Sequence, residues 1–150
     1  IGTPEKSKHS LSLFSIYLLY GSLMYWGRLA KKAKVGVGVG KADDVVNAFK
    51  KAKTDGRKNL VTVPITKALS IPHKVTGTFG ACNIVMRPSI EGSGVVAGGS
   101  VRTVLEVAGV KNVIAKQLGS NNILNNARAA VVALDNLTTK TEVAKKRNLQ

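Results

Sequence analysis

A glycine-rich loop within the stretch from Met86 to Arg128 constrains the fold more than any other feature of the sequence. An apolar strand pattern ends near Met86, and the loop GSGVVAGGS occupies residues 92–100 before a helical pattern begins. A second polar turn, at residues 119–122, leads into another helical pattern. Glycine permits positive φ angles and close approach of a backbone, and such turns can direct N–H groups at phosphate oxygens. We therefore expect strands and helices that are joined by two anion-binding turns.

The charge of the chain indicates the same kind of partner. The 150 residues include 23 Lys and Arg against 8 Asp and Glu, a formal net charge of +15 with an isoelectric point near 10.3. The basic residues are spread along the chain rather than gathered in one tail, which favours a domain enclosed by polyanion. Nucleic acid or an anionic membrane could neutralise this excess, and charge alone does not separate the two.

The first 34 residues differ from the remainder and are set apart as a divergent apolar and basic segment. Residues 11–26 (LSLFSIYLLYGSLMYW) are uncharged and contain most of the aromatic residues. Two lysines precede them, as in a signal peptide, but the stretch is shorter than the roughly 20 residues that span a bilayer. Two interpretations stay open: a signal or membrane anchor, and two buried strands at 11–19 and 23–26.

Residues 35–41 (VGVGVGK) alternate valine with glycine. They fail the Walker A pattern twice, because Val35 and Ala42 stand where glycine and Ser or Thr are required. A nucleotide-dependent enzyme built on this segment is therefore not expected. We expect a strand whose glycines admit another backbone, or RNA, at close range.

A helix is predicted from about residue 41 to residue 53, because apolar residues recur there at helical spacing. Asp43 and Asp44 would lie in its first turn, where the helix dipole favours negative charge. Its predicted apolar stripe consists of Ala42, Val45, Val46, Phe49 and Ala52. The exit of this helix is strongly basic, which predicts phosphate contact in a chain of this charge.

Strands are predicted at 60–65 and 81–87. Pro64 places the first at an edge or a terminus, and Pro72 predicts an extended segment at 70–74. In the second strand, alternate residues face a core, so that Cys82 is a small buried residue rather than a nucleophile.

The loop at 92–97 matches the pattern GxGxxA, but no acidic residue follows about twenty positions later, so a dinucleotide site is not predicted. Ser100 is instead predicted as the N-cap of a helix over 101–108 that ends at Gly109. A strand at 112–115 comes next. The turn at 119–122 then caps a last helix, whose predicted stripe is Leu124, Ala127, Val131, Leu134 and Leu137. Beyond Thr138 we expect a polar and basic tail that is mobile or held only by its partner.

Neither enzyme chemistry nor a cofactor is predicted. Paired carboxylates, triad elements and metal-ligand spacings are not visible in the sequence. Cys82 is the single cysteine, and His9 and His73 are too isolated to build a metal centre. His73 is predicted to hydrogen-bond within the protein or to face RNA.

From Val35 to about Leu137 the sequence resembles the small-subunit ribosomal protein five family of bacterial and plastid type. The matching blocks are GVGVGKA (36–42), KNLVTVP (58–64), the long run over 87–122 and LNNARAAVVAL (124–134). The resemblance implies an α+β fold with two domains: the remainder of a double-stranded-RNA-binding-like domain over 35–64, and a C-terminal domain over 65–137 with a four-stranded sheet, two helices and a left-handed βαβ crossover. Residues 138–150 would form the basic tail. The basic loop of the family's first domain is not found in residues 1–34, so its role is not carried over.

The resemblance implies a structural constituent of the small ribosomal subunit that binds small-subunit rRNA, contacts proteins four and eight near the mRNA entrance and supports decoding accuracy. It implies a ribosome in a plastid, another organelle or a bacterial cytoplasm. The residues predicted to contact rRNA are Lys41, Lys50, Lys53, Arg57, Lys58, His73, Lys74, Arg87, Lys116, Ser120, Asn121 and Arg128. Those predicted to face a neighbouring protein are Gly92, Gly94, Gly98, Gly99 and Arg102. The alternative is a membrane-surface protein anchored by residues 11–26.

Overall fold

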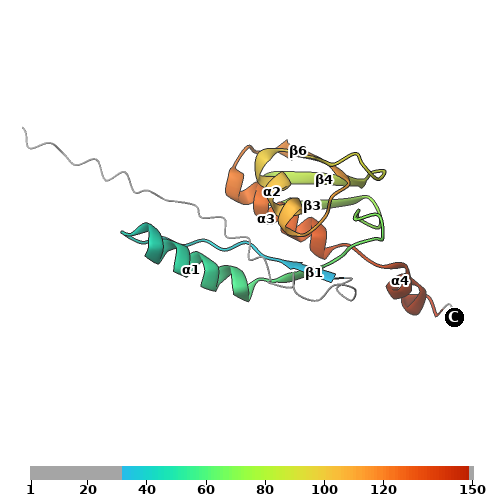
Figure 1. Cartoon of the computed structure of the whole chain (residues 1–150), viewed down its shortest axis with the longest axis horizontal. Coiled ribbons are helices and arrows are strands. Elements are labelled where there is room, and N and C mark those ends of the chain that lie inside the picture. The colour runs from blue at the N-terminus through green and yellow to red at the C-terminus, as the bar shows by residue number, and fades with distance from the viewer. Residues whose placement is uncertain (1–31, 149–150) are drawn as a thin grey trace, which may run out of the picture.

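The computed structural model describes residues 32–148 and has α+β architecture (Figure 1). Its elements are β1 (Lys32–Val35), α1 (Val45–Lys58), β2 (Val61–Pro64), β3 (Val75–Phe79), β4 (Cys82–Pro88), β5 (Val95–Val96), α2 (Gly99–Val107), β6 (Val113–Gly119), α3 (Ile123–Asp135) and α4 (Lys140–Lys146). The predicted strands or anchor at 11–26 lie outside the described residues.

The first unit consists of β1, β2 and α1. The two strands pair antiparallel, from Lys32 opposite Pro64 to Val35 opposite Val61. Pro64 ends its strand, as predicted. The double-stranded-RNA-binding-like character of this domain stays a prediction, because the described part of it is a two-stranded sheet and one helix.

Helix α1 begins later than predicted, and the residues it buries match the predicted stripe only in part. Its N-cap is Asp44, so both aspartates precede the first turn instead of lying in it. Ala48 and Ala52 are buried, whereas Val46 of the predicted stripe is 63% exposed. The prediction is confirmed for Ala52 and was wrong for Val46, because it followed hydrophobicity, while the partner of this helix is a backbone that only small residues can approach.

That partner is the glycine segment after β1. A Cβ atom on Gly36, Gly38 or Gly40 would overlap the carbonyl oxygen of Gly56, Ala52 or Ala48, respectively. Two residues of extended chain rise about 6.6 Å and four residues of helix about 6 Å, so each glycine faces one helical turn. The prediction that these glycines admit another backbone is confirmed. The segment lies beyond the end of β1, however, and is not itself a strand.

The second unit is a four-stranded sheet in the order β3-β4-β6-β5, covered on one face by α2 and α3 (Figure 1). Its pairs are antiparallel except β5–β6, which is parallel. The predicted alternation in β4 is confirmed: Cys82, Ile84 and Met86 are buried in the core. The four-stranded sheet with two helices is therefore confirmed, and the handedness of its crossover stays a prediction.

For helix α2, the predicted N-cap was wrong, whereas the predicted end and the predicted buried face are confirmed. Its N-cap is Gly98 rather than Ser100, which lies inside the first turn and accepts a hydrogen bond from the Gln117 amide at 3.3 Å. Gly109 follows the helix with a φ of 81°, and the residues that helical spacing predicts to face inward, Val101, Val104, Leu105 and Ala108, are all buried. The cap was misplaced because glycine, which has no side-chain acceptor, leaves little signal as an N-cap.

The turn at 119–122 caps α3 as predicted, through Asn122, whose side chain accepts bonds from the N–H groups of Leu124 and Asn125. The strand predicted at 112–115 is β6, which continues to Gly119. Strands β3 and β5 were not predicted, since one is a short Thr- and Gly-containing segment and the other has two residues.

The structure corrects the prediction of a mobile tail after Thr138. Residues 140–146 form α4, which begins with a capping box in which Thr139 and Glu142 each bond the other's backbone N–H. The charge of this segment suggested mobility, but its Thr-x-x-Glu spacing is a helix start signal.

Candidate nucleic-acid interface

Helix α1 carries four of the twelve residues predicted to contact rRNA, namely Lys50, Lys53, Arg57 and Lys58. Lys50, Lys51, Thr54, Asp55 and Lys58 line a shallow hollow of about 350 Å³. The Asp55 carboxylate accepts a hydrogen bond from the N–H of Val39 at 3.0 Å, which ties the glycine segment to the helix. These lysines lie on the helix itself and not on an exit beyond it, because α1 continues to Lys58. One face of the helix therefore presents several cations close together.

Lys41 precedes helix α1, whereas the other candidate rRNA contacts of the first unit lie on that helix. The carbonyl oxygen of Lys41 accepts a bond from the Lys51 ammonium at 3.3 Å, and its own side chain is exposed. Lys53 and Arg57 are both on α1, where Lys53 is half-buried and Arg57 is exposed. The structure brings all of these basic residues onto or next to one helix.

A second basic surface is the face of the sheet that α2 and α3 do not cover. Arg87 lies opposite Ile114, and Lys116 lies opposite Val85, so the two cations are diagonal neighbours on adjacent strands. The alternation along β4 and β6 turns both away from the core. Ile114 and Leu118 are exposed on the same face. This uncovered face combines positive charge with aliphatic surface.

Hydrogen bonds within the protein hold the turn at 119–122. The N–H of Ser120 donates to the Ala81 carbonyl, and the Ser120 hydroxyl accepts from the N–H of Asn122. Asn121 is exposed. The Arg128 guanidinium lies 5.4 Å from the centre of the Phe79 ring, a cation–π contact that positions it near this turn.

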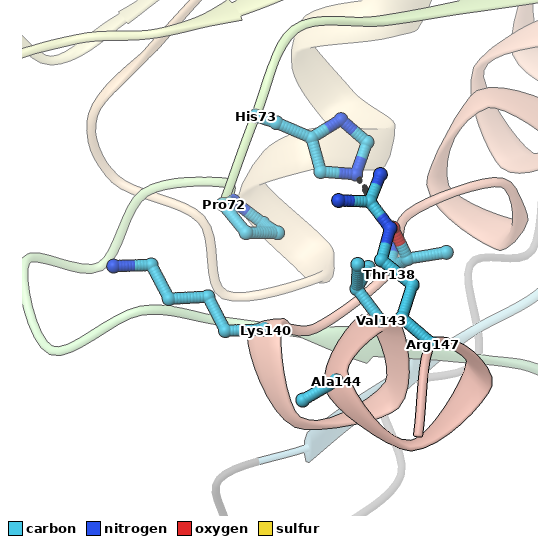
Figure 2. A pocket seen from close by; sticks show the side chains of 7 residues that line it. All are labelled: Pro72, His73, Thr138, Lys140, Val143, Ala144 and Arg147. Carbon is cyan, nitrogen blue, oxygen red and sulfur yellow. Dashed lines mark hydrogen bonds between the residues drawn. The ribbon is translucent and has the colours of Figure 1, made fainter. Parts of the chain in front are cut away.

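His73 has internal partners on both ring nitrogens. Nε2 accepts from the N–H of Thr138 at 3.1 Å (Figure 2). Nδ1 donates to the Lys74 carbonyl at 2.8 Å. Since a carbonyl can only accept, the Nδ1 atom carries the proton in this arrangement. Of the two roles predicted for His73, the structure thus shows the internal hydrogen bonds; the adjoining Lys74 is exposed.

Asn112 is the residue that sequence reasoning missed. Its side-chain oxygen accepts from the N–H groups of Gly92 at 3.1 Å and Gly94 at 3.4 Å, and its amide donates to the Ala68 carbonyl at 2.7 Å. The prediction that this loop offers these N–H groups to phosphate was therefore wrong. Asn112 stands twenty residues after Gly92, where an acidic residue was sought for a dinucleotide site, and that spacing was the available signal.

The loop and the start of α2 leave other groups at the surface. Ile90, at the loop's entrance, is 81% exposed. The Arg102 side chain is exposed and pairs with Glu106 one turn later at 2.8 Å. A Cβ on Gly98 would collide with the Gln117 amide, whereas one on Gly99 would meet open space. With the N–H groups of Gly92 and Gly94 bonded to Asn112, these two groups of the loop do not form a phosphate-binding site.

Metal and membrane sites find no support within residues 32–148. In that part of the chain, no cluster of three or more His, Cys, Asp or Glu side chains is placed to hold a metal ion. No helix there is long and apolar enough to cross a membrane.

Two profiles of one protein family match most of the chain. The family profile "Ribosomal protein S5, N-terminal domain" matches residues 30–64, and "Ribosomal protein S5, C-terminal domain" matches residues 77–147. "Small ribosomal subunit protein uS5c" of Phaeodactylum tricornutum is 82% identical over 119 residues, which are 79% of this chain and 68% of that protein.

Two further relatives extend the comparison. The protein of the same name from Trieres chinensis is 80% identical over 79% of this chain and 64% of its own length. "Small ribosomal subunit protein uS5" of the cyanobacterium Nostoc punctiforme is 60% identical over 79% of this chain and 68% of its own length. The chain thus spans about two-thirds of the length of these relatives.

Proposed function

The chain belongs to the ribosomal protein S5 family, a family of structural and non-enzymatic ribosomal proteins, and we propose that it binds small-subunit rRNA through its two basic surfaces. The observation that carries this proposal is the basic face of α1, where Lys50, Lys51 and Lys58 surround one hollow. Such a cluster neutralises the phosphates of a folded RNA without reading its sequence.

The uncovered sheet face supports a second contact with the same partner. Arg87 and Lys116 are exposed there on neighbouring strands. Together with Arg57 on α1 and Arg128 on α3, they distribute the positive charge over several elements of the protein. A net charge of +15 fits burial among RNA helices better than a single contact patch.

The compartment follows from the relatives. The diatom relatives carry the name uS5c, which denotes the plastid form, and the cyanobacterial relative belongs to a bacterial-type ribosome. This protein is accordingly a component of a plastid ribosome.

Contacts with ribosomal proteins four and eight, a place at the mRNA entrance and a role in decoding accuracy are part of the proposal that rests on the family. Their support is the surface formed by exposed Ile90, the Asn112-held loop at 92–94 and exposed Arg102. An apolar tip with a rigid loop and few charges is typical of a protein–protein contact.

The rRNA contact is tested by replacing Arg57 and Lys58 together with alanine and measuring rRNA binding over a series of salt concentrations. Two lost phosphate contacts should lower the slope of log affinity against log salt by about 1.4–1.8 and weaken binding to RNAs of any sequence. The control is Lys67→Ala with Lys111→Ala, because both lysines are exposed and lie outside the proposed surfaces. An unchanged slope in the Arg57/Lys58 variant, or an equal loss in the control, would contradict the assignment.

A further inference from the structure

A groove separates α4 from the segment that enters β3. It has a volume of about 380 Å³, and its lining residues are Pro72, His73, Thr138, Lys140, Val143, Ala144 and Arg147 (Figure 2). This volume lies in the range of small-ligand pockets, about 300–1,000 Å³. No carboxylate is among the lining residues, and the groove is separate from α1 and from the uncovered sheet face.

One stripe of α4, extended by its C-cap residue Arg147, forms a wall of this groove. Lys140, Val143, Ala144 and Arg147 follow the spacing i, i+3, i+4, i+7, which places them on one side of a helix. The apolar pair in the centre is only half-buried, and no residue of α4 is fully buried. In Figure 2 the Lys140 side chain extends to one side of Pro72, and the Arg147 guanidinium lies on its other side, close to the His73 ring. The wall thus has an apolar centre with a cation at each end.

Both walls are fixed by hydrogen bonds. The His73 ring accepts from the backbone N–H of Thr138 at 3.1 Å, which joins the segment before β3 to the residue before the α4 cap. The capping box of Thr139 and Glu142 then sets the direction of the helix. Because these bonds hold the two walls in place without an occupant, ordering the groove would cost a ligand little binding free energy.

We propose that this groove binds a single unpaired nucleotide of the rRNA, with its base against Pro72, Val143 and Ala144 and its flanking phosphates against Lys140 and Arg147. Unpaired bases are the parts of RNA that proteins extract and contact individually, and an Arg guanidinium plane is a recurrent base-stacking partner. The backbone positions of the two cations are about 10 Å apart along the helix. An acidic side chain of a protein would offer one charge to this arrangement, whereas a nucleotide in a chain has a phosphate on either side of its base.

This inference rests on the proposed rRNA binding and assigns it a specific contact. It also gives His73 a positioning role, because the ring shapes the groove while its nitrogens are engaged with Thr138 and Lys74. The basic segment after Thr138 is then a defined RNA contact rather than a diffuse charge.

The first test uses the full chain and pairs of charge changes on one helix. Lys140→Ala with Arg147→Ala should lower the salt slope of rRNA binding by about 1.4, the value for two phosphates of single-stranded RNA. Lys145→Ala with Lys146→Ala removes the same charge from residues that do not line the groove and should leave the slope close to that of the unmodified chain. Equal losses in the two variants would overturn the proposal, since α4 would then act only through its total charge.

The second test addresses the apolar centre without changing charge. Small-subunit rRNA labelled with 4-thiouridine is photo-crosslinked to the protein, and the crosslinked peptide is identified by mass spectrometry. We expect a crosslink within 140–147 that Ala144→Phe abolishes and that Thr141→Phe, on the exposed side of the helix, retains. Circular dichroism checks that both variants keep their helix content.

The outcomes separate this inference from the proposed function. If the unmodified chain binds rRNA but gives no crosslink in 140–147, the groove inference fails and the proposed function stands. If assembled subunits crosslink this segment to a protein instead, a protein occupies the groove and the inference is overturned. If the unmodified chain does not bind rRNA at all, the proposed function itself fails.

Discussion

At the scale of single residues, Asn112 has the widest effect on the surface. One buried amide bonds the loop after β4 at Gly92 and Gly94 and the loop after β2 at Ala68. Two segments that are far apart in the chain are thereby fixed relative to β6. The glycine loop owes its shape to this side chain as much as to the positive φ angles of its own glycines, 87° at Gly92 and 73° at Gly94.

Asn112→Ala should therefore loosen the glycine loop. The change leaves the Ala68 carbonyl and two N–H groups without their partner, and an unsatisfied buried polar group costs about 1–3 kcal/mol. Amide hydrogen exchange at Gly92 and Gly94, measured by NMR, should accelerate by at least tenfold, which is the effect of about 1.4 kcal/mol. Lys111→Ala, at an exposed neighbouring position, serves as control; equal protection of both glycines in the two variants would show that Asn112 does not hold the loop.

At the scale of elements, the contact between the glycine segment and α1 organises the first unit. Helix and extended chain meet through main-chain atoms, with Ala48, Ala52 and Gly56 on one side and three glycines on the other. The helix can therefore keep its long basic side chains for the exposed face. A small-residue contact on one side and a cluster of lysines on the other are two results of one packing arrangement.

Gly38→Ala should destabilise this unit. The added methyl group would overlap the Ala52 carbonyl and the Gly56 backbone, which cannot move away as a side chain could. Overpacking of this kind costs about 1–3 kcal/mol, to be measured by urea unfolding followed by circular dichroism. Gly99→Ala is the matched control, because a Cβ there meets nothing within 4 Å and should leave stability unchanged or slightly higher. Equal stabilities for the two variants would refute the close approach.

At the scale of the whole molecule, basic surfaces lie on both units. The hollow on α1 belongs to the first unit, and the uncovered sheet face and the α4 groove belong to the second. Cations placed on several sides repel one another in the free protein, and RNA that passes between them relieves this repulsion. The arrangement suits a protein that joins several RNA segments.

The tagged protein in its native lysate should accordingly sediment with the small ribosomal subunit on a sucrose gradient. RNase treatment before centrifugation should move it to the top of the gradient, because rRNA is the partner that we propose for its basic surfaces. Sedimentation as a free protein in the untreated lysate would contradict the proposed function.

The sequence by itself determined the features that depend on neighbouring residues. The burial of Cys82, Ile84 and Met86 follows from strand periodicity, the end of α2 from Gly109, and the cap of α3 from a polar turn. The resemblance likewise rests on continuous blocks of sequence. These signals are local, so no knowledge of the fold was needed to read them.

Only the tertiary structure decided which groups meet across the chain. The face that α1 buries depends on a glycine segment whose Val39 bonds Asp55, 16 residues away. The N–H groups of the glycine loop turn inward because Asn112, 18 and 20 residues away, accepts from them. The α4 groove exists because Thr138 meets His73 across 65 residues. Hydrophobicity and propensity describe one segment at a time, whereas each of these contacts depends on the geometry of two.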